Sequence, residues 1–382
     1  MAKSKAAKPS IPTSRRPYNA LFISAFIALA TIFGVLMRVD TAINGVPIDL
    51  PEIVEAGHFP NGVPIVKRYT GIEAIDTVAQ FFVAVFLAGP LGWDPGAQAQ
   101  QRHFLLNWFA VVCVWSAEAY RGRNKGRIIT FLTPLAILYQ TVGACVIAPL
   151  YYAFYLYSSS QDAYHFQGRE VSPAYAKVLL PAAVLGYLVP SIALWYTPWS
   201  NNNAAQYLAA FWQISPLIAG ALIPIFSFFV PSSSTKAKNS DVKHLRVLYI
   251  VTALICAAEH IHTLYSCFTS DDPRVSFSYV FLPDRATMKD SMTLGLHYIM
   301  QLDFWGVFIS ALFWCWIVLY DSMRILGGYT TSHLIQNFLG LVFHALVIGP
   351  GATLALVYHW REERLVMIES GVKGSWKKPK AA

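Results

Sequence analysis

The sequence is poor in charge. Asp, Glu, Lys and Arg make up only 13% of its 382 residues, whereas soluble domains carry about 25%. Hydrophobic residues reach 55%, and the mean hydropathy is +0.44. These proportions do not decide the class of protein by themselves. The decisive feature is that many apolar stretches reach about 20 residues, the length that a helix needs to cross a bilayer.

The sequence also lacks the spacings that build disulfide or metal frameworks. Its five cysteines fall within or at the ends of apolar runs without a CxxC or CxxH spacing, namely Cys113, Cys145, Cys256, Cys267 and Cys315. We interpret them as small buried apolar residues. HExxH motifs, Cys/His quartets and calcium-binding loops are missing, so we expect no metal site and no cofactor. Asp271 and Asp272 are adjacent, unlike the acids one helical turn apart that chelate Mg²⁺ in diphosphate-binding boxes.

The apolar runs are continuous and do not alternate with polar residues, which favours helices over a β-barrel. We therefore predict an all-α fold, a polytopic transmembrane helical bundle with about nine spans, or eight. The predicted spans cover residues 19–37, 71–92, 103–120, 127–157, 175–196, 207–230, 245–268, 293–320 and 333–359. The first run is long and follows a basic, polar segment, so we expect a retained span rather than a cleaved signal.

The predicted bundle covers residues 19–360, between a basic N-terminal tail at 1–18 and a charged C-terminal tail at 361–382. The net charge is +8, and the basic residues gather in the tails and in short loops. This distribution fits contact with an anionic leaflet, and we expect no nucleic-acid partner. Nine spans place the basic loops 121–127 and 236–246 on opposite sides. Either one run does not span, or the positive-inside rule is weak here.

Ionisable residues inside apolar runs are the first candidates for function, because a charge at the bilayer centre costs about 2.5–3.5 kcal/mol. The candidate catalytic residues are Glu259, Asp303, Asp76, Glu118 and His262. Glu259 and His262 are three residues apart and share a helix face. Glu259 and Asp303 lie deepest by residue count, so we rank them first. We expect at least three of the four acids to face one cavity.

Each acid also has a purely structural interpretation. Glu259 could fix helix packing together with a neighbouring histidine, and Asp303 could hydrogen-bond to another helix. Asp76 could favour the start of its helix through the helix dipole. Glu118 could be neutralised by Arg121, three residues later.

Aromatic residues make up 14% of the chain, and many of them fit the belts found at membrane interfaces. Others lie deep in the apolar runs, where ring faces could shelter a cation. The candidate substrate-binding residues are Trp108, Trp115, Trp212, Tyr265, His297, Gln301 and Trp305. For any single tryptophan, packing is the simpler explanation.

Three kinds of function fit these features. The first is an intramembrane enzyme in which a buried, neutral carboxylic acid protonates an alkene or epoxide. Aromatic faces would stabilise the carbocation, and a second carboxylate or a histidine would take the final proton. The second is a proton-coupled secondary transporter, although no inverted repeat is visible. The third is a scaffold or receptor-like membrane protein, for which acids inside the spans are costly.

Three segments carry a resemblance to a known family: Gly71–Asp76 leading into an aromatic run, Glu259-His260, and Gln301–Trp305. The chain resembles the membrane-bound terpene cyclases of fungal meroterpenoid pathways, in particular the longer kind associated with macrophorin- and ascofuranone-type products. The resemblance implies metal-independent cyclisation of a farnesyl- or epoxyfarnesyl-bearing aromatic in the endoplasmic reticulum membrane. The implied partners are a lipophilic small molecule and the bilayer. Shorter, seven-span cyclases are similar in using a Glu and an Asp, but their positions do not transfer to this longer chain.

Overall fold

The computed structural model describes residues 12–231 and 238–376, which are helical apart from loops and three isolated β-bridges. The helices are α1 (Asn19–Gly34), α2 (Thr41–Ile43), α3 (Leu50–Ala56), α4 (Glu73–Phe86), α5 (Pro95–Ala119), α6 (Leu132–Thr141), α7 (Ala144–Ser158), α8 (Pro173–Ala183), α9 (Val189–Tyr196), α10 (Asn202–Trp212), α11 (Ser215–Phe228), α12 (Val242–Thr269), α13 (Phe277–Phe281), α14 (Met292–Leu326), α15 (Thr331–Ile348) and α16 (Pro350–Glu369). The π-helical segments Val35–Asp40 and Val184–Leu188 join α1 to α2 and α8 to α9. The all-α prediction is confirmed for this part of the chain.

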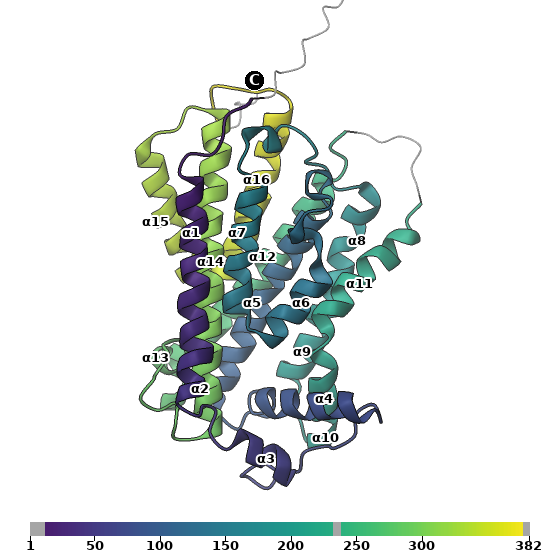
Figure 1. Cartoon of the computed structure of the whole chain (residues 1–382), viewed down its shortest axis with the longest axis vertical. Coiled ribbons are helices and arrows are strands. Elements are labelled where there is room, and N and C mark those ends of the chain that lie inside the picture. Colours follow the sequence, from purple (N-terminus) through teal and green to yellow (C-terminus); the bar gives the residue numbers. More distant parts are fainter. Residues whose placement is uncertain (1–11, 232–237, 377–382) are drawn as a thin grey trace, which may run out of the picture.

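The helices form a bundle whose two ends lie at the top and bottom of Figure 1. The upper end comprises residues 12–18, 119–131, 158–172, 239–241, 326–330 and 370–376, and the lower end comprises 44–72, 87–94, 197–201 and 270–291. Side chains join distant segments at both ends. Arg16 forms an ion pair with Asp321 at 2.6 Å at the upper end. Tyr279 donates to Asp94 at 2.7 Å at the lower end.

Five helical stretches are long and apolar enough to cross a membrane: Asn19–Ile43, Pro173–Tyr196, Val242–Thr269, Met292–Leu326 and Thr331–Ile348. A sixth is the pair α10 and α11, which is bent by 56° at its break. These stretches are consistent with a membrane protein. The predicted count of nine spans is not confirmed, because several of the predicted spans have a different form.

The predicted span over residues 71–92 contains only the short helix α4. Its 14 residues cover about 21 Å, less than the hydrocarbon core of about 30 Å. Figure 1 shows α4 lying across the lower end of the bundle. Val83 and Ala84 are fully buried while Ile75 and Val78 are exposed, so α4 is an amphipathic helix with one face turned to the interior.

The predicted span over residues 127–157 is instead a hairpin of α6 and α7. The chain enters the bundle from the upper end along α6 and returns to the upper end along α7. Arg127 precedes α6 and donates to the carbonyl oxygen of Ser158 at the end of α7, so both ends of the hairpin lie together. The chain reverses at Gly143, whose φ is +115°. This φ lies in a region that favours glycine, and the flexible end of the Met37 side chain packs against the same position.

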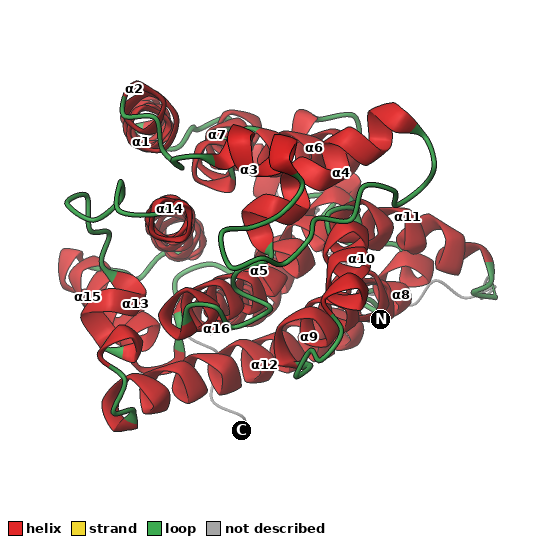
Figure 2. Cartoon of the chain, turned by 90° about the horizontal axis from the view of Figure 1, so that it is seen from below, coloured by secondary structure: helices red, strands yellow, loops and turns green. Residues whose placement is uncertain are grey.

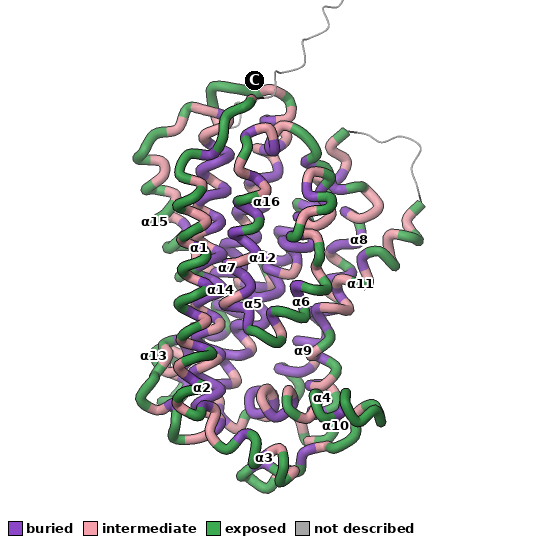
Figure 3. The backbone as a smooth tube through the Cα atoms, viewed as in Figure 1, coloured by how far each residue is buried: buried purple, intermediate pink, exposed green. Residues whose placement is uncertain are grey.

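The predicted span over residues 333–359 is also divided, because α15 ends at Ile348 and α16 begins at Pro350. Between them Gly349 has a φ of +91°. α16 returns to the upper end, where the N–H of Gly374 donates to the carbonyl oxygen of Leu326 at 2.7 Å. It continues to Glu369, past residue 360, where we placed the end of the bundle. Figure 3 shows that α15 is largely exposed and α16 largely buried.

Helix α5 is the centre of the bundle, as the view in Figure 2 shows. It contacts α8, α12, α14 and α16, and most of its side chains are buried, including the polar Gln100, His103 and Asn107. These polar groups find partners on other helices. Gln100 donates to the carbonyl oxygen of Met300 at 3.0 Å, and the amide oxygen of Asn107 accepts the N–H of Gly351 at 3.0 Å. The structure therefore buries polar side chains of α5 at its core, and the surrounding helices supply partners for several of them.

The two ends differ in charge. Basic residues near the upper end are Arg15, Arg16, Arg121, Arg123, Lys125, Arg127, Arg169, Lys238, Lys243, Arg246, Arg324, Arg361, Arg364 and Lys373. At the lower end, acids outnumber the basic residues Lys67, Arg68, Arg274, Arg285 and Lys289; the acids are Asp49, Glu52, Glu55, Glu73, Asp76, Asp94, Asp271, Asp272, Asp284 and Asp290. Loops 121–127 and 238–246 lie at the same end because the α6–α7 hairpin does not span. Nine spans would place these two basic loops on opposite sides, against the positive-inside rule. The arrangement in the structure places them on one side and agrees with the rule. Residues 1–11 and Lys236 lie outside the described residues.

This arrangement predicts the accessibility of single cysteines placed at exposed loop positions. In a Cys267→Ser background, Lys125→Cys and Lys238→Cys are expected to react from the same side of sealed microsomes, and Asp271→Cys from the other side. The measurement is labelling by a membrane-impermeant maleimide before and after permeabilisation. Opposite sidedness of positions 125 and 238 would restore the nine-span arrangement.

Candidate active site

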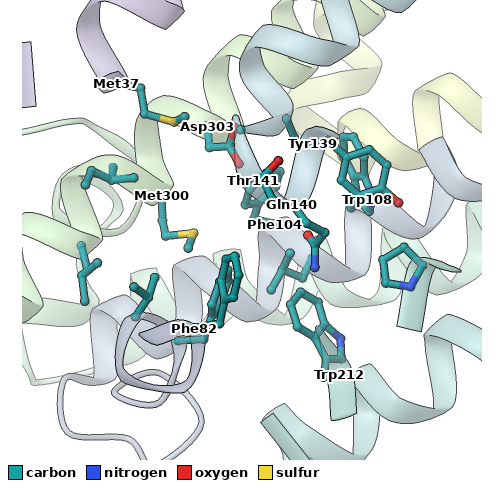
Figure 4. Close-up of a pocket in the computed structure, with 18 of the residues that line it drawn as sticks. Met37, Phe82, Phe104, Trp108, Tyr139, Gln140, Thr141, Trp212, Met300 and Asp303 are labelled. Carbon is teal, nitrogen blue, oxygen red and sulfur yellow. The ribbon is translucent and has the colours of Figure 1, made fainter. Parts of the chain in front are cut away.

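A cavity of about 210 Å³ lies inside the bundle, toward its lower half, between α4, α5, α6 and α14 (Figure 4). Its wall combines aliphatic side chains with these aromatic ones: Phe81, Phe82, Phe86, Phe104, Trp108, Tyr139, Tyr187 and Trp212. Its polar side chains are Arg38, Gln140, Thr141 and Asp303. Asp303 is the only carboxylic acid among the described residues that line this cavity, and no histidine lines it. An acid in an aromatic chamber is the arrangement that proton-started carbocation chemistry requires.

The break between α6 and α7 holds Asp303 in place. Asp303, on α14, accepts the backbone N–H of Cys145 at 2.6 Å with one carboxyl oxygen. This N–H belongs to the first turn of α7, where the helix dipole attracts an acid. On the other side of the break, Arg38 donates to the carbonyl oxygens of Thr141 and Val142 at 2.9 and 2.8 Å. Two side chains from distant helices therefore satisfy the backbone of the reversal and fix the carboxyl group beside the cavity.

Glu259 lies outside the cavity. Its carboxylate accepts Arg102 Nε at 2.9 Å and the hydroxyl of Thr263 at 2.9 Å, and the hydroxyl of Tyr196 also donates to it. His262 is exposed, and its Nδ1 lies 3.1 Å from Arg102 Nη2. These contacts join α5, α9 and α12.

Glu118 also lies away from the cavity, in a buried ion network at the upper end. One carboxylate oxygen accepts Arg121 Nε at 2.6 Å and Arg361 Nη1 at 2.7 Å. Arg121 also pairs with Glu362. All four side chains are at most 2% exposed, so this network ties α5 to α16.

The Asp76 carboxylate forms hydrogen bonds with the loop that precedes α4. Its carboxylate accepts the backbone N–H groups of Tyr69, Thr70 and Gly71 at 3.1, 2.7 and 3.0 Å and the Thr70 hydroxyl at 2.9 Å. These hydrogen bonds, led by the one from the Thr70 N–H, lower the pKa of Asp76. Only Asp303 of the four acids reaches the cavity, so our expectation that at least three of them would share one is wrong.

The lowered pKa of Asp76 predicts a pH-dependent contribution to stability. The stabilisation is present above the unfolded carboxyl pKa of about 3.9 and is lost as pH falls through the lower folded value. Asp76→Asn is therefore expected to lower the melting temperature at pH 7, and the difference from wild type should shrink below pH 4. Intrinsic fluorescence melts in detergent measure this, with the exposed acid variant Glu73→Gln as the control. A difference that stays constant with pH would contradict the hydrogen-bonding role.

The structure divides the predicted substrate-binding residues among several places. Trp108 and Trp212 line the cavity. Trp115 stacks on Tyr151 with ring centroids 3.9 Å apart and borders a small adjoining pocket. Trp305 donates to the carbonyl oxygen of Phe281. His297 and Gln301 line a second, separate pocket at the lower end, and Tyr265 is 66% exposed.

Several cavity residues were not among the sequence candidates, notably Phe82, Phe104, Tyr139 and Gln140. The aromatic run after Asp76 contained a usable signal, because an amphipathic α4 must turn one face of that run inward. Tyr139 and Gln140 sit at the end of α6, and only the hairpin brings them to Asp303.

His103 was also missed, although it forms part of a buried pair. Its Nε2 lies 2.8 Å from His260 Nδ1, and His260 Nε2 lies 3.0 Å from the carbonyl oxygen of Leu346. The adjacent residues form the Arg102–Glu259 ion pair, so two consecutive polar pairs join α5 to α12. In the described part of the chain, no group of three or more His, Cys, Asp or Glu residues could hold a metal ion.

The all-helical bundle and the acid in an aromatic cavity define a helical protein suited to carbocation cyclisation. Comparison with known proteins gives the family: the chain belongs to the CtvD-domain family, whose model matches residues 20–367. This family includes fungal terpene cyclases. The chain is 25% identical to the terpene cyclase ascI of Acremonium egyptiacum over 80% of this chain and 82% of the relative. It is 25% identical to the terpene cyclase resF of Aspergillus sclerotiorum over 91% and 95% of the two chains.

A longer relative is the FAD-dependent monooxygenase BOA8 of Botryotinia fuckeliana. It is 24% identical over 68% of this chain, but the match covers only 33% of the relative. No solved structure matches the chain significantly. The family assignment therefore rests on the domain model and on the cyclases that match along most of their length.

Proposed function

We propose that this protein is an integral-membrane terpene cyclase that cyclises the farnesyl or epoxyfarnesyl chain of an aromatic meroterpenoid precursor. The observation that carries the proposal is the position of Asp303, the one acid that the described residues place on the wall of the aromatic cavity. The family supports the reaction class, since relatives matching most of the chain are named terpene cyclases. The apolar helices and the lipophilic substrate support a membrane location, which we place in the endoplasmic reticulum.

Asp303 would start the reaction as a general acid. A carboxyl group in an apolar cavity favours its neutral form and can donate a proton. With a farnesyl chain, the proton forms a C–H bond at the terminal double bond and leaves a cation. With an epoxide, it forms an O–H bond while a C–O bond breaks. The hydrogen bond from the Cys145 N–H occupies one carboxyl oxygen, which orients the other for the transfer.

The aromatic wall would guide the cation that follows. Ring faces such as those of Phe104, Trp108 and Trp212 attract a cation, and an apolar chamber keeps out water that would quench it. The cavity volume of about 210 Å³ is below the roughly 300 Å³ of small ligand pockets. Substrate entry therefore requires side chains on the wall to move, and Phe81 on α4 is the partly exposed candidate.

The last step is loss of a proton from a carbon next to the final cation, which forms a double bond. The sequence suggested a second carboxylate or a histidine for this step, but neither lines the cavity among the described residues. We propose that the Asp303 carboxylate, formed in the first step, takes this proton back. The product is then an isomer of the substrate, and the acid is restored for another turnover.

Incubation of the purified protein with a farnesyl-bearing aromatic in deuterium oxide tests this mechanism. The exchanged Asp303 carboxyl should deliver one deuterium to carbon, so the cyclised product should be one mass unit heavier than the substrate. With the epoxide, the deuterium should lie on oxygen and wash out. EDTA should leave both rates unchanged. A product without carbon-bound deuterium from the alkene, or activity lost with EDTA and restored by Mg²⁺, would contradict the proton-started mechanism.

A further inference from the structure

A third pocket, of about 350 Å³, lies at the upper end, and none of its lining residues belongs to the aromatic cavity. It is lined by Gly122, Arg123, Arg127, Tyr164, Gln167 and Gly168. The loop after α5 supplies Gly122 and the two arginines, and the segment after α7 supplies Tyr164, Gln167 and Gly168. The backbone N–H of Arg123 donates to the carbonyl oxygen of Gly168 at 2.8 Å, which closes the two segments around the pocket.

The guanidinium group of Arg123 is buried without a hydrogen-bond acceptor among the described residues. Its side chain is 3% exposed, yet Nε, Nη1 and Nη2 all lack an acceptor in the described part of the chain. The nearest acid is Glu118, whose Oε2 lies 4.0 Å from Nη2. The other oxygen of Glu118 already accepts Arg121 and Arg361 at 2.6 and 2.7 Å. The buried network therefore leaves one guanidinium group with its charge weakly compensated and its donors unused.

A buried guanidinium in this state is costly unless a ligand supplies the missing acceptors. Its planar set of N–H donors matches the oxygens of a phosphate, which it binds through two parallel hydrogen bonds. No carboxylate of the described residues lines the pocket, and the Glu118 carboxylate near Arg123 is already paired with Arg121 and Arg361.

The neighbouring groups hold the guanidinium in place. Arg123 lies over the ring of Tyr164 at 4.4 Å, and Arg127 lies over the same ring at 5.3 Å. The Tyr164 hydroxyl donates to Asn124 Oδ1 at 2.6 Å. Arg127 Nε donates to the carbonyl oxygen of Arg123 at 3.0 Å. Two cations thus flank one aromatic ring, and all three residues line the same pocket.

We propose that this pocket binds a phosphate group, as carried by a phospholipid at the surface of the membrane. The upper end is the basic end of the bundle, where anionic headgroups gather. Apolar side chains beside the pocket suit acyl chains: Ile128 is 51% exposed, Phe131 55% and Tyr157 75%. The site is distinct from the cyclase cavity, and the proposal does not depend on the cyclase reaction.

Thermal unfolding of the full-length protein in neutral detergent tests the proposal. Dioleoylphosphatidylglycerol should raise the melting temperature by several degrees, whereas dioleoylglycerol, which lacks the phosphate, should not. Adding sodium phosphate, with sodium chloride at equal ionic strength as the control, shows whether the bound phosphate group comes from a lipid headgroup or from free inorganic phosphate. A response to the lipid alone identifies a headgroup site, and an equal response to inorganic phosphate identifies a site for the free anion. No response to either would overturn the proposal.

Substitutions of single residues test whether Arg123 is responsible for the rise in melting temperature. With Arg123→Gln, about ten times more ligand should be needed to reach the same rise in melting temperature. This factor corresponds to the loss of one charge-assisted hydrogen-bonded contact. Lys125→Gln removes the same charge from an exposed residue of the same loop and should respond like wild type. Arg123→Lys keeps the charge but loses the paired donors and should be intermediate, which also decides the question if Arg123→Gln does not fold. A wild-type response from both Arg123 variants would remove Arg123 from the site.

Discussion

Asp303→Asn is expected to abolish cyclisation while the protein remains folded and inserted. Asparagine keeps the size of the side chain and can still accept the N–H of Cys145, so the cap of α7 persists. It cannot give a proton to an alkene or epoxide. General acid catalysis contributes roughly 10²–10⁴-fold, and since no second acid among the described residues lines the cavity, we expect turnover to fall by at least that range. The measurement is product formed per folded molecule in detergent-solubilised, quantified enzyme.

A matched control separates loss of the acid from a general change of charge. Asp271→Asn alters an exposed acid of the lower end and should cyclise at the wild-type rate. The melting temperature of Asp303→Asn should stay close to that of wild type, because the hydrogen bond to α7 remains. Near-normal turnover in Asp303→Asn would remove Asp303 from the reaction. Lost turnover with a large fall in melting temperature would show that its main role is to hold the α6–α7 break.

The sequence predicted the helical class because helix formation in an apolar chain depends on local information. Long apolar runs with few charges satisfy their backbone groups only as helices. Run length does not, however, distinguish a span from a hairpin of two shorter helices. Gly143 and the Gly349-Pro350 step were visible as helix breakers, but whether the chain continues or reverses there depends on what packs against it. Met37 at Gly143 and His260 at Gly349 supply that packing, and both come from distant segments.

The same distinction applies to the site. The cost of burying charge led us to select four acids from the sequence, but their partners decide what each one does. Asp303 meets Cys145 from 158 positions away, and Glu118 meets Arg361 from 243 positions away. Neither contact can be predicted from the spacing of neighbouring residues in the sequence. Arg102, which neutralises Glu259, lies on α5 at a position where the sequence suggested only the edge of a span.

The Glu118 network leads to the second large expected effect, which is on stability rather than on turnover. Glu118→Gln leaves Arg361 and Arg121 buried with less negative charge between them. Removing one partner of a buried ion pair costs about 3–5 kcal/mol, and a large loss of folded protein or a strongly lowered melting temperature is expected. Glu363→Gln is the matched control, because its pair with Arg246 is partly exposed and such pairs contribute about 0–1 kcal/mol.

Turnover of Glu118→Gln, measured per folded molecule, distinguishes this role from the catalytic one that the sequence allowed. Glu118 touches the α16 arginine and not the cavity, so the fraction that folds should cyclise at close to the wild-type rate. The amount of folded enzyme is quantified by size-exclusion chromatography before the assay. A variant that melts like wild type but forms no product would contradict the structural role, because only a group in contact with the reaction loses rate without losing stability. That result would also place the upper-end network, rather than the Asp303 cavity, at the centre of the chemistry.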